Sequence, residues 1–445
     1  MKTNNTFYKT VWNIALPVTL QSLLQSSFSV IDQIMTGQLG SVSIAGIGLG
    51  GKFSSIFSVV VSAVAAAAGI MIAQYMGKKD EKEVSRSFFV NLLAAVSLAA
   101  FFTVVSAAFP FQIMGIYTKD QDTRMAAAGY LRIMAVSYIP IAVNMLLATL
   151  LRCMEAALFP LYASILAAGL NTGLNYLLIF GKCGFPRMGV NGAAWATVTA
   201  QIFGCIVTFV LFWRHYRRQT MKMEFICHLG REKGIQYLGI LLPILICEFL
   251  WSLGENVYAA IYGRIGTQPC AAMTLTAPVQ GLMIGALSGL SQAAGIITGK
   301  SLGSREFDRA YREAKKLMLF GLIGSAALSL LLLAVSPYYV RIYQVEPSVR
   351  NTAVKILTAY AVISPVKVQN MILGGGIVRS GGKTKYIMWI DFIGTWFFGV
   401  PLGMLAAFVW KLQIPWVYFI LSLEECVRLG ITLVVFRGKK WMESI

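Results

Sequence analysis

Charged residues are scarce in this sequence of 445 residues. Asp, Glu, Lys and Arg make up 13% of it, whereas hydrophobic residues make up 57% and the mean hydropathy is +0.68. Because a soluble globular domain carries about 25% charged residues, this composition excludes one. Apolar runs of about 20 residues, long enough to cross a bilayer core about 30 Å thick, recur along the chain. We therefore predict a polytopic membrane protein without a large soluble domain.

The sequence also lacks the motifs of ATP-driven and catalytic proteins. Its glycine runs, residues 46–51, 374–376 and 380–382, do not complete the phosphate-binding pattern GxxxxGK[ST], and no HExxH zinc motif is present. We expect no enzymatic activity, no cofactor and no direct use of ATP. Close helix packing or local unwinding explains the glycines better.

Cysteine and histidine are few and scattered. The seven cysteines stand singly, without the paired spacing of a metal site or a disulfide framework. The two histidines, His215 and His228, fall in one basic segment, residues 214–234. The net charge is +19, and the excess lies in short loops between apolar runs. Since membrane topology and anionic lipid explain such an excess, we expect no binding to nucleic acid.

The apolar runs predict an all-α protein of twelve transmembrane helices. The expected spans are residues 11–38, 45–76, 88–110, 126–151, 159–181, 190–214, 234–262, 271–299, 317–338, 352–376, 384–408 and 414–436. Most Lys and Arg residues then lie at the membrane face that holds the N-terminus, and basic residues are retained on the cytoplasmic side. We expect a multi-pass protein of the cytoplasmic (inner) membrane with both termini in the cytoplasm.

The two halves of the chain repeat each other at an offset of 226 residues. The matched pairs include Pro17/Pro243, Ser26/Ser252, Gly37/Gly263, Gly40/Gly266, Gly77/Gly303 and Arg86/Arg312. A single register that keeps Pro, Gly and Arg in place argues against chance similarity between apolar stretches. The chain therefore contains an internal repeat.

Each repeat contains six predicted helices, so both copies enter the membrane in the same direction. Repeats of this kind are related by a pseudo-two-fold axis along the membrane normal. We predict an N-lobe over residues 1–215 with helices one to six and a C-lobe over residues 234–445 with helices seven to twelve. Residues 216–233 form a cytoplasmic linker between the lobes, and a cleft is expected between them.

Several carboxylates lie within predicted spans. Asp32, in the first helix, is flanked by uncharged sequence, and a charge at that depth costs about 2.5 to 3.5 kcal/mol or more. It is either a proton or cation site or a structural carboxylate. Glu255 lies in the matching helix of the second repeat, one helical turn from the position equivalent to Asp32. We expect both carboxylates to face the cleft.

Other embedded acids have simpler explanations beside a functional one. Asp391 either takes part in function or pairs with Lys367 or Arg379. Glu248 lies nearer to the end of its helix. On the last helix, Glu424, Glu425 and Arg428 have the spacing of an ion-paired set within one helix.

Two asparagines in the fifth span, Asn171 and Asn175, are one helical turn apart on the same face. Paired Asn side chains in lipid either join helices by hydrogen bonds or supply oxygen ligands to a cation. With Asp32 nearby, the second interpretation predicts a possible sodium site at Asp32, Asn171 and Asn175. Aromatic and Met residues that line the cleft would suit flat, cationic organic substrates.

With these residues in view, the chain resembles the multidrug and toxic compound extrusion (MATE) family of secondary transporters, in a bacterial form. The likeness covers nearly the whole chain. It rests on four stretches: ALPVTLQSLLQSSFSVIDQIMTGQLG, AAGIMIAQYMGKKD, NTGLNYLLIFGKCGFPRMGVNGAAWAT and GGGIVRSGGKTK. It implies a V-shaped pair of six-helix bundles that exports organic cations in exchange for sodium or protons.

The resemblance also assigns roles to single residues. Asp32 falls on the family's acid in helix one, and Glu255 resembles its frequent acid in helix seven. Asn171 and Asn175 stand where the family usually has Asn and Asp, and Thr197 stands near its helix-six Thr. Gln369 and Asn370 lie near the place of a helix-ten acid that is absent here. Pro17 and Pro243 are the expected points of helix bending.

The resulting prediction is a secondary active multidrug efflux antiporter that works by alternating access. It is expected to be a monomer, with small organic cations and membrane lipids as partners and with sodium or protons as the coupling ion. The alternative is a lipid-linked oligosaccharide or lipid flippase of the same superfamily, although such relatives tend to have more helices and a strongly cationic cleft. A channel or an intramembrane enzyme has no supporting motif.

Overall fold

The structure is a computed structural model that describes residues 2–218, 223–226, 228, 230–341 and 346–445. Throughout these residues the regular secondary structure is helical, which confirms the predicted all-α class. Part of the predicted linker, residues 219–222, 227 and 229, lies outside the described residues.

The first half of the chain runs from α1 to α8. Its elements are α1 (Lys2–Thr36), η1 (Gly37–Leu39), α2 (Ser41–Lys78), α3 (Glu81–Ala108), α4 (Pro110–Tyr117), α5 (Gln121–Met134), η2 (Ala135–Ser137), α6 (Tyr138–Cys153), α7 (Leu158–Phe180) and α8 (Val190–Tyr216). The short helix α4 was not predicted; it begins at Pro110, and proline favours the first position of a helix because its missing N–H has no partner to lose there.

The second half runs from α9 to α16. Its elements are α9 (Arg231–Ile265), α10 (Thr267–Gly303), α11 (Phe307–Arg341), α12 (Pro347–Asn370), η3 (Met371–Val378), η4 (Arg379–Gly381), α13 (Thr384–Phe392), η5 (Ile393–Gly399), α14 (Val400–Met404), η6 (Leu405–Val409), α15 (Ile414–Ser422) and α16 (Glu424–Arg437). Three of them, η3, η5 and η6, are π-helical, and η3 contains the glycine run 374–376.

Eleven helices among the described residues are long and apolar enough to cross a membrane. They correspond to the first eleven predicted spans. The twelfth, residues 414–436, is divided at Leu423 into α15 and α16, which have 9 and 14 residues. Together these two helices cover the predicted last span. The prediction was right about the position of the span along the chain and wrong about its being a single helix.

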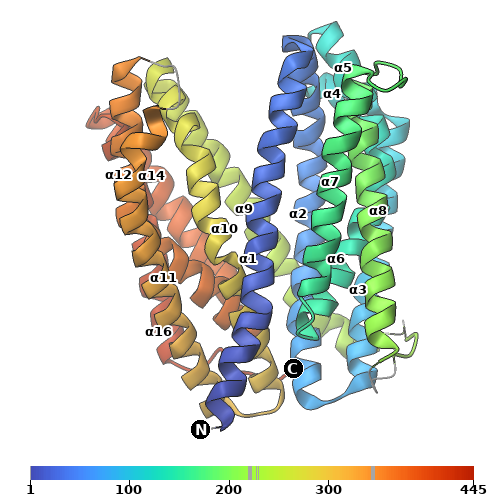
Figure 1. Ribbon diagram of the computed structural model, residues 1–445. Coiled ribbons are helices and arrows are strands. Elements are labelled where there is room, and N and C mark those ends of the chain that lie inside the picture. The colour runs from blue at the N-terminus through green and yellow to red at the C-terminus, as the bar shows by residue number, and fades with distance from the viewer. Residues whose placement is uncertain (1, 219–222, 227, 229, 342–345) are drawn as a thin grey trace. The chain divides into compact units, whose positions relative to one another are not determined.

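The chain divides into two compact units. Unit 1 comprises Met1–Thr19, Ala73–Lys79 and Gly234–Ile445, and unit 2 comprises Leu20–Ile72 and Asp80–Lys233. In unit 2, α7 and α8 lie side by side, as do α11 and α12 in unit 1 (Figure 1). The helices α1 and α2 each contribute to both units. The lobes predicted at residues 1–215 and 234–445 remain a prediction.

The end of α2 belongs to unit 1 because it packs closely on the end of α10. A Cβ atom at Gly77 would collide with the Lys300 backbone, and one at Gly303 would collide with the Gln74 backbone. The 226-residue offset converts each contact into the other, because Gln74 matches Lys300 and Gly77 matches Gly303. Matching segments of the two sequence repeats, at the ends of α2 and α10, therefore pack against each other with local two-fold symmetry.

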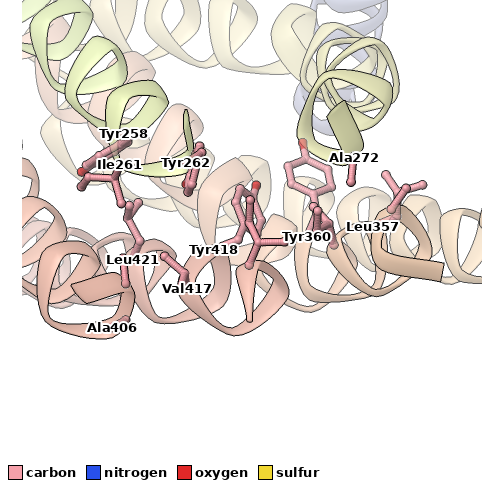
Figure 2. Close-up of a cluster of buried hydrophobic side chains, with 14 of the residues drawn as sticks. Tyr258, Ile261, Tyr262, Ala272, Leu357, Tyr360, Ala406, Val417, Tyr418 and Leu421 are labelled. Carbon is pink, nitrogen blue, oxygen red and sulfur yellow. The ribbon is translucent and has the colours of Figure 1, made fainter. Parts of the chain in front are cut away.

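One apolar core of unit 1 is built from α9, α12 and α15, with further side chains from α10, α11 and α14. Figure 2 shows its side chains: Tyr258 and Tyr262 come from α9, Tyr360 comes from α12, and Tyr418 comes from α15. All four are buried, with exposed fractions between 1% and 8%. Tyrosine combines a large apolar ring with a hydroxyl that requires a partner, so this core brings polar chemistry into the middle of the helices.

The crossing of α2 and α10 predicts that neither glycine tolerates a side chain. We expect Gly77→Val and Gly303→Val each to destabilise the protein by about 1–3 kcal/mol or more, because the backbones must move apart. The measurement is the thermal midpoint of the purified protein in detergent. Gly48→Val is the matched control on α2, since a Cβ atom there would meet nothing within 4 Å. Equal midpoints for all three variants would contradict the close crossing.

Candidate functional site

Four of the predicted site residues lie together in unit 2 and form what we call the Asp32 cluster: Asp32, Asn171, Asn175 and Thr197. The Nδ2 atom of Asn175 donates to the Asp32 carboxylate and, at 3.2 Å, to Oδ1 of Asn171. Asn171 in turn donates to Thr197 Oγ1 at 3.3 Å, and Thr197 donates to the Ala193 carbonyl at 3.0 Å. One hydrogen-bonded chain thus joins α1, α7 and α8.

Helix geometry explains why these side chains meet. Residues four apart lie on one face of a helix, so Asn171 and Asn175 point the same way from α7, which packs along α8. Asn175 is fully buried, and its Oδ1 atom has no hydrogen-bond partner among the described residues. A buried acceptor without a partner is costly, which makes this oxygen a candidate ligand for a bound ion or water.

The chemistry of the Asp32 cluster suits a small cation or a proton. It contains one carboxylate, which is partly exposed, and neutral amide and hydroxyl oxygens around it. Hard cations prefer oxygen ligands of this kind, whereas a proton needs only the carboxylate. Among the described residues no Lys or Arg forms an ion pair with Asp32, so its charge is free to be balanced by something that binds.

In unit 1, Asp391 has partners other than those expected. One of its two interpretations, beside a role in function, was an expected pair with Lys367 or Arg379. Instead it accepts hydrogen bonds from the Arg428 guanidinium, at 2.9 Å from Nε, and from the Cys247 thiol at 2.7 Å. This expectation was wrong because α13 packs against α16, a contact that the helical pattern of either segment does not reveal. Arg379 instead lies 3.4 Å from Glu248.

Glu425 is held by several donors. The Asn370 amide donates to both the Glu425 side chain and its backbone carbonyl, each at 2.7 Å. Arg428 lies 3.5 Å away on the same helix, which confirms that part of the predicted ion-paired set. Lys367 lies at 3.9 Å, the outer limit of an ion pair. Glu425 therefore remains well satisfied even without Lys367.

Glu424 departs from the predicted set on the last helix. It accepts a hydrogen bond from the Tyr258 hydroxyl of α9, and both side chains are buried. Tyr258 occupies the position that matches Asp32 under the repeat offset. At the position of unit 1 that matches Asp32, α9 therefore carries the tyrosine Tyr258. The nearby carboxylate, Glu424, comes from α16.

Two of the cavities within unit 1 share Lys367 and Glu425. The first, of about 270 Å³, also contacts Asp391, Asn370 and Arg428. The second, of about 300 Å³, is called here the Glu255 cavity. Its lining includes Glu255, Tyr258, Tyr262, Met273, Lys367, Tyr418, Glu424 and Glu425. Glu255 is exposed at this cavity and has no ion-pair or hydrogen-bond partner among the described residues.

The remaining predicted residues have more local surroundings. Gln369 is buried, and its side chain donates to the Met318 carbonyl at 2.9 Å, so it joins α12 to α11. Pro17 and Pro243 are buried inside α1 and α9, which continue as helices through both positions. Bending at these prolines remains a prediction.

Sequence reasoning gave too little weight to Lys367 and Glu424. Lys367 was treated as a possible partner of Asp391, and Glu424 as a partner of its own helix. A signal was available, because a lysine within an apolar span and two adjacent acids in another are rare and costly in lipid. Such residues are expected near a cavity or near each other, and here they line the same cavity.

Comparison with known proteins matches most of the chain to one family. A family model described as MatE matches residues 17–177 and 243–405; the two matched segments begin at the repeated prolines. The uncharacterized transporter YisQ of Bacillus subtilis strain 168 is 23% identical, over 98% of this chain and 95% of that protein. The probable multidrug resistance protein NorM of Thermotoga maritima is also 23% identical, over 97% and 93%.

Solved structures support the fold. A crystal structure of MATE in complex with MaL6 matches with a TM-score of 0.88 and 17% identity, over 97% of this chain and 95% of that chain. An outward-facing multidrug resistance MATE family transporter of the MOP superfamily matches with the same score, identity and coverage. Likeness at this level of identity concerns the fold alone.

The ion pair between Arg428 and Asp391 predicts a specific stability pattern. Both side chains are largely buried, at 13% and 15% exposed, so we expect Arg428→Met to cost roughly 3–5 kcal/mol by leaving a buried carboxylate unpaired. The double variant Arg428→Met with Asp391→Leu should recover much of that loss. The measurement is the thermal midpoint in detergent, with exposed Arg437→Met as the control on the same helix. A double variant no more stable than Arg428→Met would contradict the pairing.

Proposed function

The chain belongs to the MatE family of transporters, and we propose that it is a secondary active multidrug efflux antiporter. It exports organic cations or drugs in exchange for sodium or protons, and it does so by alternating access. Alternating access requires a binding site and a scaffold with two states whose populations the ligands shift. No chemical step on the substrate is part of this proposal.

The Asp32 cluster is the observation that carries the proposal. A carboxylate within a membrane span persists only if it has a use or a strong partner, and the hydrogen bond from Asn175 supplies no positive charge. Sodium or a proton at Asp32 neutralises the carboxylate. The unpartnered Oδ1 of Asn175 and the Thr197 hydroxyl offer further oxygens to sodium.

Coupling follows from the effect of this ion on the two states. An ion shifts the balance between states only by the difference in its affinity for them, and couplings of about 1–3 kcal/mol are typical. The hydrogen bond from Asn175 to Asp32 joins α7 to α1. Ion binding at Asp32 therefore changes the strength of the interaction between these two helices. We propose that this interaction is the part of unit 2 that differs between the states.

The Glu255 cavity supports the second part of the proposal, which is binding of the exported drug. Its carboxylate provides an opposite charge for an organic cation, and its tyrosine rings provide flat apolar surfaces with cation–π attraction. We propose that the drug binds here while the coupling ion binds at the Asp32 cluster, so the two units divide the work. The protein acts as a monomer in the cytoplasmic membrane, with both termini in the cytoplasm, membrane lipids around it and no nucleic-acid partner.

Removing the charge of Asp32 tests this proposal. We expect Asp32→Asn to lose at least tenfold of efflux activity, because the coupling ion then has no carboxylate to bind. The measurement is the export of ethidium from cells that lack their own pumps, or uptake into everted vesicles. Asp122→Asn, an exposed acid in the first turn of α5, is the control.

The same vesicles identify the coupling ion. Efflux should stop when both the sodium gradient and the proton gradient are removed, and should persist with one of them alone. Full transport by Asp32→Asn, or transport that continues without either gradient, would show that Asp32 does not couple an ion to export.

A further inference from the structure

Lys367 is the unusual residue of the Glu255 cavity. Its ammonium group and the Glu255 carboxylate line the same space of about 300 Å³. Both side chains are reachable: Glu255 is exposed, and the Lys367 side chain is 31% exposed. A cavity meant only for cations gains nothing from a lysine, because like charges repel strongly where water is scarce.

A purely structural role for Lys367 is poorly supported by its surroundings. Its ion partner in the described structure is Glu425, at 3.9 Å, whereas Glu425 already has the Asn370 amide at 2.7 Å and Arg428 at 3.5 Å. Glu424 is bonded to Tyr258. The charges that remain least satisfied in the cavity are therefore one ammonium, on Lys367, and one carboxylate, on Glu255.

The aromatic wall of the cavity is fixed in place. Tyr418 donates to the Gln280 side chain at 3.1 Å, and the Tyr258 hydroxyl donates to the Glu424 carboxylate; both tyrosines line the cavity. The ring centroids of Tyr262 and Tyr418 lie 6.4 Å apart, with the ring planes tilted by 45°, and Figure 2 shows the two residues close together. Because hydrogen bonds hold the hydroxyls of Tyr258 and Tyr418, their rings offer flat apolar surface to a bound molecule.

The Lys367 ammonium, the Glu255 carboxylate and the tyrosine rings together suit a ligand that has two opposite charges and a flat ring between them. A plain cation meets Glu255 but is repelled by Lys367, and a plain anion meets Lys367 but is repelled by the acids. A zwitterion pairs with the Lys367 ammonium and the Glu255 carboxylate at once. Pockets of this kind gain specificity from a few well-placed polar groups on an apolar lining.

We infer that Lys367 determines specificity, so that the Glu255 cavity prefers aromatic zwitterions, which carry an ammonium and a carboxylate, over plain organic cations. The inference rests on the proposed export function and narrows its substrate class. The ammonium of the ligand lies toward Glu255, and its carboxylate lies toward Lys367.

Norfloxacin and its ethyl ester test this preference, because esterification removes the carboxylate and leaves the same ring and ammonium. Binding to the purified full-length protein is measured by equilibrium dialysis at neutral pH. We expect norfloxacin to bind about tenfold more tightly than the ester, which equals about 1.4 kcal/mol. In Lys367→Met, norfloxacin should weaken to the level of the ester or below, while the ester keeps or improves its affinity.

Two further variants distinguish the effect of losing the Lys367 charge from a general loss of structure. Lys367→Arg retains the positive charge and should retain the preference, whereas Lys355→Met removes an exposed lysine from the same helix, outside the cavity, and should change neither affinity. Equal binding of the two probes by the original protein, no binding of either, or a preference that survives Lys367→Met would overturn the inference.

Transport assays keep this inference distinct from the proposed function. If norfloxacin binds in a manner that depends on Lys367 but is never exported, the antiporter proposal fails and the specificity of the cavity stands. If both probes are exported equally by the original protein and by Lys367→Met, the antiporter proposal stands and the specificity fails.

Discussion

The close crossing of α2 and α10 is the constraint on which the arrangement of the helices within unit 1 depends. Lipid offers no hydrophobic force between helices, so their association relies on tight packing, and tight packing relies on small residues. Gly77 and Gly303 let each backbone lie directly against the other. Because the two contacts are equivalent under the repeat, a single duplicated segment supplies both sides of the crossing, and α2 thereby joins unit 1 although most of it lies in unit 2.

The two repeats keep the same backbone features but differ in their charges. The offset of 226 residues matches prolines and glycines, yet Asp32 meets Tyr258, Lys367 meets Ile141, and Glu424 meets Val198. Backbone shape depends on residues that change helix geometry or spacing, whereas a charged side chain can differ between the repeats without changing the helix that carries it. One scaffold thus carries two different electrostatic environments.

Those environments obey one rule, since a charge within a membrane protein needs a partner. Unit 1 meets the rule internally for three of its acids: Arg428 pairs with Asp391 and Glu425, and Tyr258 donates a hydrogen bond to Glu424. Unit 2 holds Asp32 with only the neutral amide of Asn175. Among the described charged residues at the Asp32 cluster and the Glu255 cavity, Asp32, Glu255 and Lys367 are left incompletely paired, and these are the residues through which ligands are proposed to act.

The sequence by itself determined where the first eleven apolar spans lie along the chain, the repeat and the list of embedded polar residues, because hydrophobic length and the helical period are local properties. It also placed Asn171 and Asn175 on one face, and the structure brings them to Asp32 and Thr197. Only the tertiary structure decided that Asp391 pairs with Arg428, that Glu424 bonds to Tyr258, and that Lys367 shares a cavity with Glu255. Such partners lie far apart in the chain and depend on how each helix is rotated against its neighbours, which packing decides and no single helix reveals.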